Sequence, residues 1–200
     1  MTVTPQPPQV LSVTPSPLAV VQGATGMLTV TLNAAQATDT VVPITTNNAM
    51  VVGVPVSVTV PAGLTTAPVS VSGLTIGTAT VTATLNGTAT ASVNIVPPPP
   101  VVTALGPIPP VTAPLTLAKG RTGVLQVTIN RAPTDPTVIT RQNSATSVVT
   151  VPPRVTVPAG QLTASFPVTT QTEGQATITA SFNSTSATAQ VVVTAPEVES

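Results

Sequence analysis

The chain has 200 residues, of which only 5% are charged, with five Lys and Arg balanced by five Asp and Glu, and it contains no His, Cys, Trp or Tyr. Hydrolytic triads, neutral-pH general bases and zinc or redox centres depend on His or Cys, so we expect no enzyme, no cofactor and no metal site. The formal net charge of zero also excludes the basic surface that nucleic-acid binding needs.

Composition and hydropathy indicate a β protein without a membrane span. Roughly 75 positions are Thr or Val, whose β-branched side chains favour strands. Thr, Ser, Gly or Pro interrupts the apolar runs every few positions, so the sequence shows no transmembrane segment. Residues 2–5 lack the charged and then apolar pattern of a signal peptide, and we expect a chain that is mature, trimmed or cut from a longer one.

The sequence repeats itself at a shift of 97 residues. Residues 26–33, 60–63 and 77–83 recur, with conservative changes, as residues 123–130, 157–160 and 174–180. Such self-similarity indicates tandem modules. We predict a Pro-rich N-terminal arm or residual linker (1–9), a first domain (10–96), a polyproline linker (97–100), a second domain (101–196) and a tail (197–200).

The N-terminal segment allows two interpretations. Residues 2–8 resemble the exit from a module, as at residues 95–98, and this fits a chain excised from a longer array. Alternatively, the first nine residues are an arm that docks on a neighbouring copy by strand addition.

Within each module, apolar residues alternate with Thr, Ser or Gln, the period of two that turns one face of a strand toward the core. About seven short strands per module, separated by Gly, Pro and Asn turns, predict two tandem immunoglobulin-like Greek-key β-sandwiches. The expected inward-facing residues are Leu28, Val30, Leu32, Val56, Val58, Val60, Ala67, Val69, Val71, Ala79, Val81, Ala83 and Leu85 in the first module, and Leu125, Val127, Ile129, Ala164, Phe166, Val168, Ala176, Ile178, Ala180 and Phe182 in the second.

The last hairpin of each module tests this pattern. Asn86-Gly87 predicts a two-residue type I′ turn, whereas Asn183-Ser184-Thr185 predicts a loop that is one residue longer. The extra residue should keep the apolar face of the following strand inward. The inward residues after the turn are Ala89, Ala91, Val93 and Ile95 in the first module and Ala187, Ala189, Val191 and Val193 in the second.

Prolines define the joint between the modules. The run at 97–100 predicts a semi-rigid polyproline II spacer of roughly 12 Å. Four further prolines should break the first edge strand of the second module and hinder edge-to-edge pairing. These are Pro107, Pro109, Pro110 and Pro114.

The first module has Val-Pro-Ala-Gly at 60–63, then alternating Ser/Thr and apolar residues, an Ala-Thr-Val-Thr-Ala-Thr strand at 79–84, Asn-Gly at 86–87 and a closing Ala/Val strand. With these motifs, nearly all of both modules resembles the bacterial immunoglobulin-like (Big-type) domains. Such domains form tandem arrays in secreted and cell-surface proteins, as stalks, spacers, adhesin shafts and assembly modules. The resemblance implies an extracellular or cell-surface location and carries no catalytic residues.

The basic side chains are the first candidates for a ligand site. Asp39 is the one charged residue of the first module, whereas all the basic residues fall in the second, together with Asp135 and Glu173. A basic face there could attract an anionic glycan, but we favour solvated loop charges. The basic residues are Lys119, Arg121, Arg131, Arg141 and Arg154.

Other candidate sites have plainer interpretations. Asn86 and Asn183 match the N-glycosylation pattern, although turn chemistry explains both without a sugar. Five scattered acids do not build a calcium site. Phe166 and Phe182 occupy core-facing positions, which leaves no aromatic platform for a sugar. Lys119 precedes a turn, and the last strand of its module has no Asn, so we expect no Lys–Asn cross-link.

We therefore expect a non-catalytic extracellular structural module, a stalk or spacer of a bacterial surface or secreted protein. Its partners would be other domains of the same array or copies of itself. Two alternatives are a self-assembling subunit of an extracellular filament or sheath, with terminal arms docking on neighbouring copies, and an adhesin that binds a glycan or a host protein.

Overall fold

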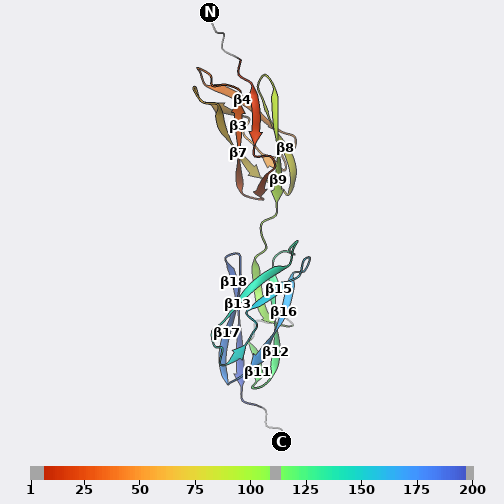
Figure 1. Ribbon diagram of the computed structural model, residues 1–200. Coiled ribbons are helices and arrows are strands. Elements are labelled where there is room, and N and C mark those ends of the chain that lie inside the picture. The colour runs from red at the N-terminus through yellow and green to blue at the C-terminus, as the bar shows by residue number, and fades with distance from the viewer. Residues whose placement is uncertain (1–6, 109–113, 197–200) are drawn as a thin grey trace, which may run out of the picture. The chain divides into compact units, whose positions relative to one another are not determined.

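Two β-sandwiches, divided between Pro98 and Pro99, make up this computed structural model (Figure 1). The structure describes residues 7–108 and 114–196. We call the two units module 1 and module 2. Within the described residues each module has nine strands, which form one four-stranded and one five-stranded sheet. This is the all-β architecture of two sandwiches that the alternating pattern predicts.

The two modules have the same strand order. The strands of module 1 are β1 (Val10–Thr14), β2 (Leu18–Val21), β3 (Thr25–Leu32), β4 (Thr40–Thr46), β5 (Val52–Gly53), β6 (Ser57–Val60), β7 (Thr66–Gly73), β8 (Gly77–Thr84) and β9 (Thr88–Val96). Those of module 2 are β10 (Val102–Pro107), β11 (Leu115–Ala118), β12 (Thr122–Ile129), β13 (Thr137–Asn143), β14 (Val149–Thr150), β15 (Arg154–Val157), β16 (Thr163–Thr170), β17 (Gly174–Phe182) and β18 (Thr185–Thr194). The sheets of module 1 have the orders β1-β3-β7-β5 and β2-β9-β8-β4-β6, and module 2 repeats both as β10-β12-β16-β14 and β11-β18-β17-β13-β15.

The first strand of each module is divided between the two sheets, which explains part of the excess over the seven strands predicted. In module 1, β1 pairs antiparallel with β3, whereas β2 pairs parallel with β9. Pro15 and Pro17 lie between them, and proline has no N–H to donate to a ladder. In module 2, β10 ends at Pro107. Pro109 and Pro110, at the predicted break, lie outside the described residues. The short strands β5 and β14 bring the number to nine.

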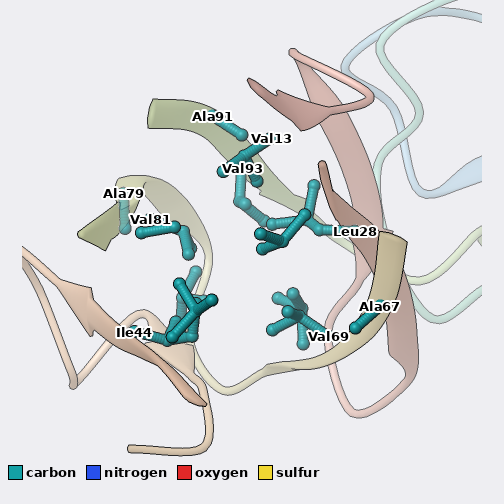
Figure 2. Close-up of a cluster of buried hydrophobic side chains, with 14 of the residues drawn as sticks. Val13, Leu28, Ile44, Ala67, Val69, Ala79, Val81, Ala91 and Val93 are labelled. Carbon is teal, nitrogen blue, oxygen red and sulfur yellow. The ribbon is translucent and has the colours of Figure 1, made fainter. Parts of the chain in front are cut away.

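The core of each module lies between its two sheets and is almost entirely aliphatic. Figure 2 shows side chains of module 1 that point toward one another from opposite sheets, among them Leu28 and Val69 from one sheet and Val81 and Val93 from the other. All three predicted inward residues of β3 and of β12 are buried. The period-two prediction is therefore confirmed for the central strands.

Seven predicted core positions differ at the margins: Val56 is exposed, and the partly buried residues are Val58, Leu85, Ala89, Ala164, Phe182 and Ala187. Val56 is 87% exposed, because it precedes β6, an edge strand whose one buried residue is Val60. Phe182 and Leu85 only pack against their cores as partly buried residues. Phe182 is the last residue of β17 and Leu85 follows β8, so both lie at the end of a sandwich, where fewer neighbours cover them.

The two terminal hairpins have turn lengths opposite to those predicted. In module 1, Thr84 pairs with Thr88 across a three-residue connection in which Asn86 has a φ of 48°. In module 2, Phe182 pairs with Thr185, and the two-residue turn has φ of 48° at Asn183 and 60° at Ser184. Two positive φ values fit a type I′ turn, which suits the twist of paired strands. The additional residue therefore lengthens the ladder instead of the loop, and the buried face of β18 is preserved as predicted.

Candidate functional site

Each module receives the chain at one end and releases it at the other. In module 1, Val10 N–H donates to Leu85 O at 3.1 Å, beside the β8–β9 hairpin, while Gln22 N–H donates to Val96 O at 2.8 Å, at the far end of β9. The nine residues of β9 separate these two points by about 30 Å at the usual rise of a strand. We call the hairpin end the leading end and the opposite end the trailing end.

Module 2 is arranged in the same way. Val102 N–H donates to the Thr185 hydroxyl oxygen at 2.9 Å, beside the β17–β18 hairpin. At the opposite end of β18, Lys119 N–H donates to Thr194 O at 2.9 Å. The chain again enters at the leading end and leaves at the trailing end.

The proline-rich residues in front of β1 are bound by two asparagines of module 1. Asn33 donates from Nδ2 to Pro7 O at 3.2 Å, and its Oδ1 accepts from Gln9 N–H at 2.9 Å. Gln9 O in turn accepts from Asn33 N–H at 3.0 Å. Asn86 donates from Nδ2 to Pro8 O at 2.8 Å. Residues 7–9 of the predicted arm thus contact their own module, and residues 1–6 lie outside the described residues.

Module 2 binds the linker that precedes it with the matching asparagines. Asn183 donates from Nδ2 to Pro100 O at 2.8 Å. Asn130 Oδ1 accepts from Val101 N–H at 2.9 Å, and Val101 O accepts from Asn130 N–H at 3.1 Å. We call Asn33 with Asn86, and Asn130 with Asn183, the asparagine pairs.

Sequence reasoning assigned Asn86 and Asn183 to turns, and their positive φ values agree with that role. It missed the second role of these side chains and the whole role of Asn33 and Asn130. A signal was present in the sequence. Asn33 and Asn86 recur at the repeat distance as Asn130 and Asn183, and a Pro-Pro pair directly precedes both Gln9 and Val101. In both modules the nitrogen that holds the proline carbonyl is the one that N-glycosylation would modify.

The five basic residues do not form one basic face. Lys119 and Arg121 follow β11 at the trailing end, whereas Arg131 follows β12 at the leading end. Arg154 begins β15 and is exposed. The prediction of a solvated loop charge is wrong for Arg141. This side chain is a buried residue of β13 with 6% of its surface exposed.

Arg141 occupies an inward position in the core of module 2. The matching residue of module 1 is Ile44, which points into the core in Figure 2. The guanidinium carbon lies 3.7 Å from the centroid of the Phe166 ring, a cation–π contact. Nη2 donates to Arg154 O. Among the described residues, Nε and Nη1 have no hydrogen-bond partner. Desolvation lowers the pKa of Arg141 to about 10, so the group is still charged at neutral pH.

The described residues contain neither a cluster of metal-ligating side chains nor a membrane-spanning helix. No three His, Cys, Asp or Glu side chains in residues 7–108 and 114–196 gather in a way that could hold a metal ion. In the same part of the chain, no helix has the length and hydropathy needed to cross a bilayer.

Comparison with solved structures identifies the type of sandwich. A titin I-band fragment with domains I67–I69 aligns over 96% of this chain and 66% of its own length, with 15% identity and a TM-score of 0.51. Its E-to-A variant gives a TM-score of 0.50. Domains 4 and 5 of the S-layer protein SbsC align over 85% of this chain and 83% of theirs, with 22% identity and a TM-score of 0.39. No protein-family model and no curated protein matches the sequence. The likeness to titin shows that the chain has an immunoglobulin-like fold in two tandem copies.

Proposed function

We propose that the chain is a non-catalytic spacer, a stalk segment of an extracellular or cell-surface protein, built from bacterial immunoglobulin-like domains of the Big type. The observation that carries this proposal is the path of the chain, which enters each module at the leading end and leaves at the trailing end. A module with this path adds the length of its sandwich to an array. A module with adjacent termini would instead hang from the array as a side branch.

The aliphatic interior and the nearly uncharged surface fit the same role. Both phenylalanines face the core, Phe166 as a buried and Phe182 as a partly buried residue, so neither offers the exposed ring on which a sugar would stack. The partners we infer are other domains of the same array. This interpretation is favoured over an adhesin that binds a glycan.

The filament hypothesis needs a terminal arm that reaches a neighbouring copy. Pro7, Pro8 and Gln9 instead form four hydrogen bonds with the asparagine pair of their own module. Those bonds would have to break before residues 7–9 could add to a foreign sheet, and this favours the spacer.

The test is the association state of the full chain. Sedimentation velocity and negative-stain electron microscopy over a concentration series from micromolar to millimolar should show monomers throughout. The matched variant lacks residues 1–6 and keeps Pro7–Gln9, and it should behave identically. Regular fibres formed by the full chain and abolished by this deletion would contradict the spacer and make the N-terminal residues the functional site of a polymer subunit.

A further inference from the structure

We propose that each asparagine pair is a binding site for the backbone of a Pro-Pro-X segment, and that this site makes the last residues of a linker part of the module that follows. The inference deepens the proposed spacer role and rests on it for its purpose. Both modules carry the site, and the preceding residues of the same chain occupy both copies.

The chemistry of the site suits a proline-rich ligand. Proline has no N–H, so an extended proline segment presents carbonyl oxygens as its only backbone hydrogen-bonding groups. Asn86 and Asn183 supply N–H donors to such carbonyls, those of Pro8 and Pro100. The first residue after the prolines restores an N–H, and Asn33 Oδ1 accepts it in module 1. Asparagine carries a donor and an acceptor on one side chain, which aspartate and leucine do not.

The hydrogen bonds involve the backbone of residue X and not its side chain. X is Gln9 in module 1 and Val101 in module 2, yet both donate their N–H to the first asparagine and accept from its N–H. A polar and a β-branched residue therefore satisfy the same site. Prolines at the preceding position are common to both segments.

The site is also independent of the spacing along the chain. Gln9 and Asn33 are 24 residues apart, whereas Val101 and Asn130 are 29 apart. Pro8 and Asn86 are 78 residues apart, whereas Pro100 and Asn183 are 83 apart. The second module thus has five more residues between the linker and each asparagine. The same hydrogen bonds form in both modules despite this difference in chain length. The geometry of the asparagine pair therefore determines them, and not the number of residues that connect it to the linker.

Amide hydrogen exchange in the full chain tests the site directly, because Gln9 and Val101 each carry one N–H that it protects. Asn130→Ala removes the acceptor of Val101 N–H and should raise the exchange rate of that amide about tenfold, with Gln9 unchanged. Asn33→Ala should raise the exchange rate of the Gln9 amide and leave that of Val101 unchanged. The control is Asn94→Ala on the exposed face of β9, where Oδ1 accepts from the Thr78 hydroxyl at 3.4 Å. It should leave the exchange rates of both amides unchanged.

A second variant keeps the test independent of backbone strain. Asn183 has positive φ, which alanine would resist, so Asn183→Gly removes the side chain without forcing the turn. It should also raise the exchange rate of Val101, and by less than Asn130→Ala, since the Val101 acceptor is still present.

Unchanged exchange at Val101 in both Asn130→Ala and Asn183→Gly would overturn the proposal. So would equal acceleration of Gln9 and Val101 in every variant, because that reports general destabilisation. Failure here is distinguishable from failure of the spacer. Fibre formation contradicts the spacer, whereas the exchange rates are measured on dilute monomer and concern only the linker.

Discussion

Replacing Arg141 by isoleucine should stabilise module 2, although it deletes the only charged side chain buried among the described residues. In module 1 the matching position holds a buried apolar residue, Ile44. Arg141 keeps a charge inside the sandwich, with one hydrogen bond to Arg154 O and the face of Phe166 as its compensation. Its Nε and Nη1 atoms lack partners among the described residues.

The magnitude follows from the groups involved. The substitution loses a cation–π contact of about 0.5–2 kcal/mol and one charged hydrogen bond of about 1.5–3 kcal/mol. It removes two buried nitrogen atoms without hydrogen-bond partners, at about 1–3 kcal/mol each. It also removes the desolvation penalty of a buried charge, which is several kcal/mol. Exchange of buried ionic groups for packed apolar ones is commonly neutral or stabilising by about 1–4 kcal/mol. We expect a gain of about 1–3 kcal/mol.

Urea unfolding of the full chain, followed through the separate ¹H–¹⁵N resonances of each module, measures this effect. With an m-value of about 1–3 kcal/mol/M, the midpoint of module 2 should rise by about 1 M and that of module 1 should not move. The reciprocal variant Ile44→Arg should lower the stability of module 1 by about 3 kcal/mol or more, because Val69 stands there in place of Phe166. A loss above about 1 kcal/mol in Arg141→Ile would refute the reasoning, since it would mean that the guanidinium is well satisfied.

Three more predictions concern module 2. Because burial lowers the folded-state pKa of Arg141 to about 10, the unfolded chain binds more protons between that value and the ordinary pKa of arginine. The stability of module 2 should therefore rise with pH across that window, and this slope should vanish in Arg141→Ile when urea midpoints are compared. Phe166→Ala should cost about 3–5 kcal/mol in chemical denaturation, and Phe182→Ala clearly less, because Phe182 is only partly buried; equal losses would place both rings in the core. Gly123→Ala should cost about 1–3 kcal/mol, because its Cβ would come within 2.7 Å of a Leu117 methyl group, and a neutral melting temperature would show that the β11 side chains move aside freely.

Much of the fold could be predicted because it depends on local alternation. Leu28, Val30 and Leu32 lie on one face of any strand that contains them, whatever the strand pairs with, and all three are buried. The repeat predicted that Leu125, Val127 and Ile129 would do the same, and they are buried too. The failures come where burial depends on the strand's place in the sheet, as at Val56, which directly precedes the edge strand β6.

The turn lengths and the candidate site could not be predicted in the same way. Asn183-Ser184-Thr185 could form a three-residue loop, or a two-residue turn with Thr185 added to the strand. The outcome depends on how far the pairing of β17 and β18 extends, and the last pair is Phe182 with Thr185. Arg141 looked like a loop charge, although its match with Ile44 at the repeat distance, two residues from the apolar Ile139, was a usable signal. Its contact with Phe166 joins two residues of different sheets, so the local sequence around either residue does not predict it.

The sequence by itself determined the strand state, the tandem repeat and the inward faces, because backbone stereochemistry and the hydrophobic effect act within a few residues. The tertiary structure alone decided that Asn33 and Asn86 meet the carbonyls of Pro7 and Pro8, that Asn183 meets the carbonyl of Pro100, and that Asn130 meets the N–H of Val101. These contacts join segments up to 83 residues apart. Their geometry depends on the register of every strand between them, which only the packed sandwich sets.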